Sequence, residues 1–307
     1  MIRACGIDIG SNSFRLLVAE VREGRLYPLA HDLVTVRLGE GLGLSGRLAP
    51  QAVLRAEAAL TRFVETMDAY RPECVRACAT HAVRVAGNKD DFLQRIKEQT
   101  GLRIEVLSGE EEARLALSGV LSALPEDRRR YPLFLADVGG GSTEIILQVT
   151  ARSEPRLISL PLGAVGLTEE FGADHEAMCE KIRMTFAPAL RSFTVGDMVG
   201  HTSLLVASGG TVTSLAALAL GLDRYDAQRV QNFNLDPATL HSLYAGLVAL
   251  SPRDRNDLPG LSDGRGEIIV AGAIILQELR QALASPSLLV SDAGLLEGIL
   301  LSGAADS

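Results

Sequence analysis

The sequence is poor in aromatic residues and has no long apolar segment. It contains no tryptophan, and Phe, Trp and Tyr make up 4% of its 307 residues, whereas apolar residues of all kinds make up 47%. This balance is typical of an α/β protein, and the length is sufficient for two domains. The absence of an uncharged apolar run of about 18 residues argues against a membrane-spanning helix.

Cysteine is also scarce, with only Cys5, Cys74, Cys78 and Cys179. Their spacing fits no metal-binding pattern, so we interpret them as free thiols in a reducing compartment. The first ten residues, MIRACGIDIG, lack the long apolar stretch of a signal peptide. We therefore expect a cytoplasmic protein with no membrane partner.

Positive charge is in deficit, because 30 basic residues stand against 38 acidic ones and give a net charge of −8. The basic residues form no extended block beyond the short run EDRRRY at 126–131. We therefore expect no nucleic-acid partner. An acidic protein can still bind an anion locally, with backbone N–H groups, a cation and a few arginines.

The pattern of apolar residues predicts alternating strands and helices in two domains. The run PEDRRRYP at 125–132 interrupts this pattern. It predicts domains at 1–124 and 125–307, with the terminal helix, about 294–307, as a segment that could pack back on the first domain. In the first domain we predict strands at 4–9, 14–21, 25–38, 73–80 and 103–107, and helices at 50–70 and 108–124. Between these two helices we predict a further helix, with Asn88 as its N-cap and Gly101 as its C-cap. In the second we predict strand–turn–strand at 134–149, helices at 165–171, 175–193, 237–250 and 265–283, strand–turn–helix at 204–220, a strand at 287–294 and a helix at 295–301.

Each half opens with the same design. ACGIDIGSNSFRLLVAEV at 4–21 and FLADVGGGSTEIILQV at 134–149 both place an Asp and a Gly/Ser turn between two apolar runs. The aligned pairs are Asp8 and Asp137, Gly10 and Gly139, and Ser13 and Ser142. Two such units 129 residues apart indicate a duplicated domain.

Three glycine-rich loops, at 8–13, 137–144 and 207–214, are candidate phosphate sites. Glycine lets backbone N–H groups turn inward and approach an anion closely. For one loop alone, a tight hairpin turn that needs glycine is an equally good interpretation. Three loops in a duplicated α/β protein favour a phosphate-binding cleft between two lobes, at strand carboxyl ends. The candidate phosphate-binding residues are Gly10, Ser11, Asn12, Ser13, Gly139, Gly140, Gly141, Ser142, Thr143, Gly209 and Gly210.

Acidic residues accompany these loops. Asp137 and Glu144 would repel phosphate unless a divalent cation lay between them, and Mg²⁺ prefers oxygen ligands. In SGEEEARL at 108–115, Ser108 and Glu111 have the spacing of a helix capping box. A glutamate at such a helix start could accept a proton from an attacking water, but the composition does not say which one.

Taken together, these motifs resemble the exopolyphosphatase and guanosine pentaphosphate phosphohydrolase (Ppx/GppA) family, within the actin–Hsp70–sugar kinase superfold. The matching segments are GIDIGSNSFRLLVAEV, VRLGEGL at 36–42, ATHAVRVAGN at 79–88, SGEEEARL, DVGGGSTEI, SLPLGAVGLTE at 159–169, ASGGTVTSLAAL and GRGEIIVAGAIIL at 264–276. The resemblance implies two ribonuclease-H-like (actin-like ATPase) domains. It also implies Mg²⁺-dependent hydrolysis of a terminal phosphoanhydride, with Mn²⁺ as a substitute, and it favours a homodimer.

The resemblance assigns roles to particular positions. The general base is Glu112, the second Glu of EEAR, and Arg84 matches a phosphate-contacting arginine. Asp137, Glu144, Gly139 and Ser142 match the family's metal and phosphate positions, and Asn12 and Ser13 match its first phosphate loop. Arg265 matches a later basic position of the family, and Asp8 matches the first-loop aspartate of the superfold.

Two departures from the family pattern stand out. His81 occupies a position where the family usually has Ser or Asn. Longer members carry an HD-like helical domain, which we expect this 307-residue chain to lack. We expect a shorter substrate channel. Inorganic polyphosphate is the expected substrate. Guanosine pentaphosphate (pppGpp), a superfold kinase acting on a sugar or acetate, and a non-catalytic nucleotide or polyphosphate sensor stay open as alternatives.

Overall fold

The computed structural model describes residues 1–193, 203–261 and 264–305. Contacts divide the chain into two compact units: unit 1 comprises Met1–Ser122 and Ala293–Ser307, and unit 2 comprises Ala123–Asp292. The terminal segment thus belongs with the N-terminal part of the chain, although residues 306–307 of the expected terminal helix lie outside the described residues. Among the described residues, no helix combines the length and apolar character needed to cross a membrane.

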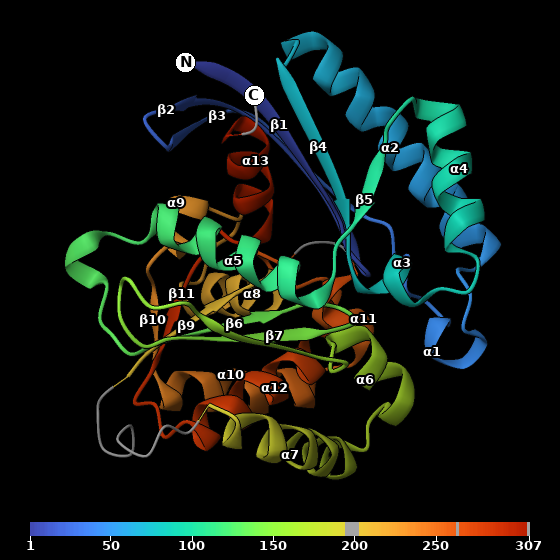
Figure 1. Cartoon of the computed structure of the whole chain (residues 1–307). Helices are drawn as coiled ribbons and strands as arrows, with labels where there is room; N and C mark the ends of the chain where they lie inside the picture. Colours follow the sequence, from blue (N-terminus) through green and yellow to red (C-terminus); the bar gives the residue numbers. More distant parts are fainter. Residues whose placement is uncertain (194–202, 262–263, 306–307) are drawn as a thin grey trace. The chain divides into compact units, whose positions relative to one another are not determined.

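Unit 1 is built on a five-stranded sheet with the order β3-β2-β1-β4-β5 (Figure 1). β1, β2 and β3 form an antiparallel meander, while β4 and β5 continue the sheet parallel to β1. The strands are β1 (Ile2–Ile9), β2 (Ser13–Arg22), β3 (Arg25–Thr35), β4 (Cys74–Ala79) and β5 (Ile104–Val106).

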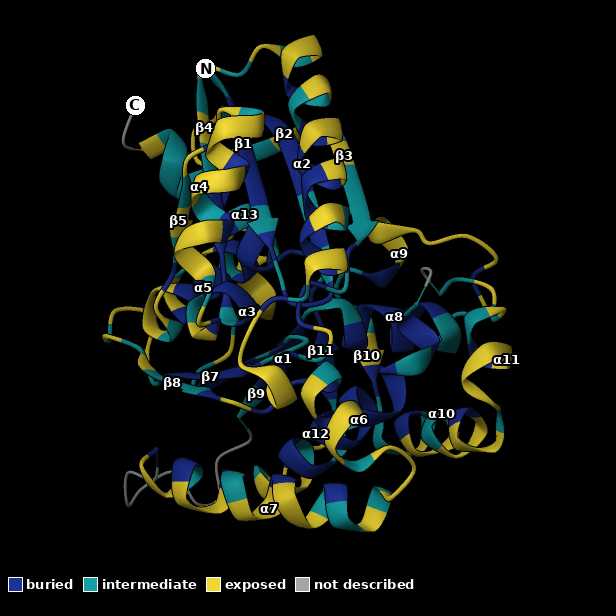
Figure 2. Ribbon diagram, turned by 90° about the vertical axis from the view of Figure 1, so that its right-hand side faces the viewer, coloured by how far each residue is buried: buried dark blue, intermediate teal, exposed yellow. Residues whose placement is uncertain are grey.

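Helices cover this sheet on both faces. Cys5, Ile7 and Ile9 of β1 belong to a buried cluster shared with α2 and α4, whereas Ala4 belongs to a cluster shared with α13. Figure 2 shows the alternation of buried and exposed positions along α2, which begins with Pro50 at its first turn. The helices are α1 (Leu42–Ser45), α2 (Pro50–Tyr70), α3 (His81–Val85), α4 (Lys89–Thr100), α5 (Gly109–Ala123) and α13 (Leu295–Ala305).

Glycines hold α5 against α13 within unit 1. A Cβ at Gly119 would lie 1.8 Å from the Gly294 carbonyl oxygen, and a Cβ at Gly298 would lie 1.9 Å from the Leu115 carbonyl oxygen. Because only glycine permits such an approach, these residues set the position of α5, whose first turn carries the three glutamates.

Unit 2 repeats the topology of unit 1. Its six-stranded sheet has the order β10-β11-β9-β6-β7-β8, so that β6, β7, β8, β9 and β11 correspond to β1 to β5, and β10 is an additional antiparallel edge. The strands are β6 (Leu133–Val138), β7 (Thr143–Gln148), β8 (Arg156–Leu160), β9 (Leu204–Ser208), β10 (Asn234–Leu235) and β11 (Leu288–Val290). The shared order and strand directions confirm the predicted duplication and the α/β class.

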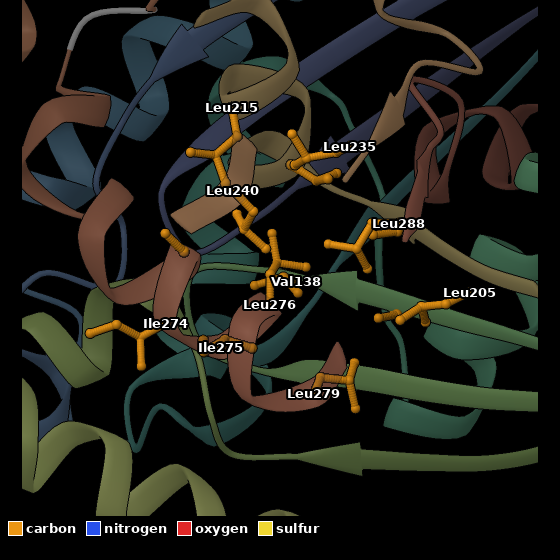
Figure 3. Close-up of a cluster of buried hydrophobic side chains, with 14 of the residues drawn as sticks. Val138, Leu205, Leu215, Leu235, Leu240, Ile274, Ile275, Leu276, Leu279 and Leu288 are labelled. Atoms are coloured by element: carbon orange, nitrogen blue, oxygen red, sulfur yellow. The ribbon is translucent and has the colours of Figure 1, made fainter. Parts of the chain in front are cut away.

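Helices α7, α8, α10 and α12 build the main core of unit 2 with the strands. Figure 3 shows Leu215, Leu240 and Ile275 in a cluster with apolar side chains of the sheet, such as Val138 and Leu205. The helices are α6 (Ala164–Phe171), α7 (His175–Arg191), α8 (Gly210–Ala219), α9 (Ala227–Val230), α10 (Pro237–Ala249), α11 (Pro252–Asn256) and α12 (Ile269–Ala282), with the 3₁₀ turns η1 (Glu126–Arg128) and η2 (Arg265–Glu267).

The elements differ from the prediction in several respects. The strands predicted at 25–38 and 287–294 are shorter, because β3 ends at Thr35 and β11 spans Leu288–Val290. The single helix predicted at 265–283 is a 3₁₀ turn, η2, followed by α12. β8 and the short elements α1, α3, α9, α11 and β10 were not predicted, because segments of two to five residues carry little periodicity. Asn88 precedes α4 without capping it: its carboxamide accepts from the Leu48 N–H at 2.8 Å and donates to the Leu48 carbonyl at 3.1 Å.

Candidate functional site

The first glycine loop joins β1 and β2 in a tight turn. The Gly10 N–H donates to the Ser13 carbonyl at 3.3 Å, and a Cβ at Gly10 would lie 2.9 Å from that oxygen. Segment 36–39, directly after β3, holds the loop from outside. Its N–H groups donate to the Asn12 carbonyl at 3.0 and 2.7 Å and to the Ser11 carbonyl at 2.8 Å. The loop conformation is therefore set by contacts distant in the sequence.

The second glycine loop, between β6 and β7, repeats this turn. The Gly139 N–H donates to the Ser142 carbonyl at 3.0 Å, and a Cβ at Gly139 would lie 3.1 Å from the same oxygen. Residues 164 and 165, after β8, donate to the Gly139 and Gly140 carbonyls at 3.0 and 2.8 Å. Since β8 corresponds to β3, both loops are held by the segment that follows the same strand of the repeat.

The second loop also packs against residues 162–163, which directly precede α6. The Thr143 hydroxyl donates to the Leu162 carbonyl at 2.6 Å and is fully buried. A Cβ at Gly163 would lie 2.3 Å from both the Gly140 carbonyl oxygen and the Gly141 nitrogen, so this position requires glycine. Loop 139–143 is thereby packed closely against the start of α6.

Asp137 and Glu144 lie opposite each other on β6 and β7. Asp137 Oδ1 accepts from the Ser208 hydroxyl at 2.9 Å, and Glu144 Oε1 accepts from the Ser159 hydroxyl at 2.7 Å. Glu144 is only 1% exposed. The structure thus places two carboxylates side by side at the end of a hairpin, each oriented by a serine from a neighbouring strand.

Unit 1 has an arginine, Arg15, at the position that corresponds to Glu144 in unit 2. Asp8 lies opposite Arg15 in the β1–β2 register, where unit 2 has Asp137 opposite Glu144. Like charges in such a pair are destabilising, whereas two carboxylates are suitable oxygen ligands for Mg²⁺. Within the described ranges, no group of three or more His, Cys, Asp or Glu residues forms a complete metal cluster. Asp8, the third predicted ligand, belongs to unit 1, while the other two belong to unit 2.

The third glycine loop brings Arg265 to the same region of unit 2 as Asp137. Gly209 has φ 96°, and a Cβ there would lie 2.6 Å from the Val138 carbonyl oxygen and 3.1 Å from Asp137 Oδ1. A Cβ at Gly210 would lie 2.1 Å from Arg265 Nη2. The Arg265 guanidinium, from a residue only 7% exposed, therefore lies on the backbone at the start of α8. A helix N-terminus and a guanidinium are both positive, and together they favour an anion.

The three glutamates at the start of α5 have different surroundings. Glu110 is exposed and pairs with Arg114 at 2.9 Å. Glu111 forms the predicted capping box: its Oε2 accepts from the Ser108 N–H at 2.8 Å, and the Ser108 hydroxyl accepts from the Glu111 N–H at 3.2 Å. These bonds hold the pKa of the Glu111 carboxyl below its usual value. Both residues therefore have a sufficient structural role.

Glu112 differs from its neighbours because it is buried. Its side chain is 7% exposed, and Oε2 accepts from Arg84 Nη1 at 2.8 Å. The same nitrogen of Arg84 donates to the Leu107 carbonyl at 2.8 Å. Arg84 thus positions the Glu112 carboxylate. His81 precedes it on α3, and burial, followed by the positive charge of Arg84, lowers the pKa of His81 to about 4.

Sequence reasoning missed the residues that hold these side chains. Ser159 and Ser208 orient the acidic pair, and segment 36–39 and Gly163 shape the two loops. The matched motifs contain all of them, but their roles depend on strand pairing across the repeat, which no local pattern reveals.

Residues 17–306 match the model of the Ppx/GppA phosphatase family, and the chain belongs to this family. Exopolyphosphatase 2 of Mycobacterium tuberculosis is 34% identical over 325 aligned residues, which cover 98% of both chains. The crystal structure of an exopolyphosphatase-like protein has a TM-score of 0.90 at 27% identity and covers 98% of this chain and 97% of its own. The crystal structure of the Aquifex aeolicus family member has a TM-score of 0.79 at 30% identity, covering 99% and 98%.

These comparisons confirm the family, the fold of two actin-like α/β domains and the interpretation of the chain as an enzyme. The roles of individual residues, the metal and the cleft between the domains stay predictions.

Proposed function

We propose that the protein is an exopolyphosphatase that hydrolyses the terminal phosphoanhydride of inorganic polyphosphate and releases orthophosphate. The observation that carries this proposal is the acidic pair Asp137 and Glu144 beside a glycine loop, in the place where unit 1 has Asp8 opposite Arg15. The 34% identical relative named exopolyphosphatase supports the same substrate.

The backbone of loops 10–13 and 139–143 binds the non-bridging oxygens of the substrate in this proposal, through N–H groups and hydroxyls. Arg265 adds a guanidinium at the start of α8, near Gly209 and Gly210. Because phosphoryl transfer needs little covalent help from the protein, positioning and charge neutralisation are the main contributions.

Glu112 is the general base. It accepts a proton from water as the water oxygen attacks the terminal phosphorus, and the bond from that phosphorus to the bridging oxygen breaks. The products are orthophosphate and a chain one phosphate shorter, which leaves as an oxyanion. Arg84 keeps the Glu112 carboxylate in place for this step, since its guanidinium lies 2.8 Å from Oε2.

The donor set of Asp137 and Glu144 fits Mg²⁺, because Mg²⁺ is bound by one or two carboxylates together with substrate phosphates. These two residues would hold the ion, and Asp8, which matches the first-loop aspartate of the superfold, stays a predicted third ligand. The bound ion would neutralise negative charge on the phosphates. Mn²⁺ has the same ligand preference and should replace it.

The test is orthophosphate release from polyphosphate of several lengths and from pppGpp, side by side, with Mg²⁺ or with EDTA. Glu112→Gln should lower turnover by about 10²–10⁴-fold, the usual contribution of a general base. Glu110→Gln is the matched control, because Glu110 lies in the same turn but is exposed and paired with Arg114.

Each outcome has a definite meaning. Release from polyphosphate that Glu112→Gln alone abolishes supports the proposal, whereas release from pppGpp only would assign the enzyme to nucleotide conversion. Full activity of Glu112→Gln would refute the base. No release from either substrate would refute the proposed reaction, and the kinase and sensor alternatives would then be tested by ATP consumption with sugars and by binding without turnover.

A further inference from the structure

Arg255, at the end of α11, is a buried cation that no part of the proposed reaction uses. It is 9% exposed. Within the described ranges, its guanidinium donates only to backbone carbonyls: Nε to Leu247 at 2.7 Å and to Leu250 at 3.1 Å, and Nη1 to Gly266 at 3.2 Å. Among the residues that the structure describes, no carboxylate forms an ion pair with it. Burial lowers the pKa of Arg255. Buried charges are normally paired, so an arginine held by carbonyls alone calls for an explanation.

The residue after Arg255 holds the same glycine from the other side. The Gly266 N–H donates to Asn256 Oδ1 at 2.9 Å, while the Gly266 carbonyl accepts from Arg255. A Cβ at Gly266 would lie 2.6 Å from the Asn256 nitrogen, so no larger residue fits. Both backbone groups of Gly266 are thus bound by two consecutive residues of α11.

Gly266 directly follows Arg265 in the 3₁₀ turn η2. The Arg265 guanidinium lies on Gly210, whose hypothetical Cβ would be 2.1 Å from Nη2. Holding a long arginine side chain on Gly210 costs conformational entropy, and this cost is smaller when the backbone of Arg265 is already fixed. The hydrogen bonds from Arg255 and to Asn256 that hold Gly266 therefore also restrict the position of Arg265.

We propose that Arg255 is a positioning residue for anion binding: it fixes η2 so that the Arg265 guanidinium stays at the start of α8, ready for a phosphate oxygen. This inference rests on the proposed function, since that function gives Arg265 its ligand. Arg255 itself does not touch the substrate. Its neutral replacement lets η2 move and weakens phosphate binding through Arg265.

The experiment is a double-mutant cycle in the full chain with Arg255→Met, Arg265→Met and the double variant. The readouts are kcat/KM for orthophosphate release, the affinity for tripolyphosphate by calorimetry, and the unfolding midpoint. We expect Arg255→Met to lower kcat/KM by about 10²-fold, the typical cost of a small misplacement in a site. In the Arg265→Met background, the same change should have little further effect on kcat/KM or affinity.

Losses that multiply fully in the double variant would overturn the proposal, because Arg255 would then act independently of Arg265. Wild-type behaviour of Arg265→Met would overturn it as well. Arg183→Met is the control for lost stability, because Arg183 belongs to the same unit and pairs with the buried Glu278, and neither residue is part of the proposed site. It should lower the unfolding midpoint and leave kcat/KM unchanged.

Arg255→Lys provides a second variant if Arg255→Met does not fold. Lysine keeps the charge but lacks the guanidinium fork that reaches three carbonyls, so the same cycle should again show a loss that depends on Arg265. Added guanidinium ion should restore part of the activity of Arg255→Met but none of that of the double variant. If the wild-type protein releases no orthophosphate, the proposed function fails, and the calorimetric cycle alone decides whether Arg255 positions Arg265.

Discussion

Replacing Glu144 by Gln should stabilise the metal-free protein, although Glu144 is almost fully buried and accepts a hydrogen bond from Ser159. Glu144 lies directly opposite Asp137, and residues in such pairs have Cβ atoms about 5 Å apart. Two like charges at about 5 Å repel by about 3 kcal/mol at an effective dielectric constant near 20. Gln keeps a carbonyl oxygen for Ser159 and removes the repulsion. After screening at the partly exposed Asp137, we expect a gain of about 1–2 kcal/mol.

Mg²⁺ should reverse this order. A ligand that binds only the folded protein adds about 2.7 kcal/mol at 100 times its dissociation constant, and Glu144→Gln removes one of the two carboxylates proposed to hold the ion. The wild type should therefore be less stable than the variant in EDTA and more stable in Mg²⁺. Urea denaturation under both conditions, at equal ionic strength, measures the crossing.

Glu278→Gln is the matched control. Glu278 is a buried carboxylate of the same unit, but its partner is the cation Arg183, so its loss should lower stability equally with and without Mg²⁺. The acidic pair is not a cation site if Glu144→Gln, like this control, is less stable than the wild type both with and without Mg²⁺. The same conclusion follows if Mg²⁺ stabilises Glu144→Gln as much as it stabilises the wild type.

Three other changes test the remaining geometry. Arg84→Met removes the guanidinium from the buried Glu112 carboxylate and should lower the free energy of unfolding by about 3 kcal/mol. Adding Glu112→Gln to this variant should restore most of that loss, as measured by urea denaturation. His81 should lower the stability of the protein as the pH falls from 6.5 to 4, because its pKa is about 6.5 in the unfolded chain and about 4 in the folded one. The thermal midpoint of His81→Asn should therefore lack this part of the pH dependence. Gly209→Ala should lower the thermal midpoint and the affinity for Mg²⁺ together, since its Cβ would meet the Val138 carbonyl oxygen at 2.6 Å at a φ of 96°; a normal midpoint would contradict the geometry.

Local signals in the sequence were sufficient for much of the fold. The glycine turns after Asp8 and Asp137, flanked by apolar runs, predicted two equivalent hairpins, and the hydrogen bonds from Gly10 to Ser13 and from Gly139 to Ser142 have the same form. The helix at 50–70 and the capping box at the start of α5 were also predicted with the correct residues. Periodicity, turns and caps involve residues a few positions apart, so the chain carries them in readable form.

Local signals failed where the contacts are long-range. Nothing near Asn88 reveals that its side chain pairs with the Leu48 backbone in place of capping α4. The strand at 156–160 escaped prediction because its partner, β7, decides its pairing. Segment 36–39 and Gly163 hold the two loops only because the sheets bring these segments together.

Residue types and short spacings were enough to predict the two-domain α/β class, the duplicated hairpins, the family and the candidate residues. Packing was needed to show which of three adjacent glutamates is buried against Arg84. It was also needed to show that Arg265 lies on Gly210 and that Arg255 binds the next residue, Gly266. Side chains 10 to 60 residues apart meet only when strands and helices pack, and burial is a property of that packing. Charge, spacing and glycine content describe what the site contains, whereas the fold selects which of these groups act together.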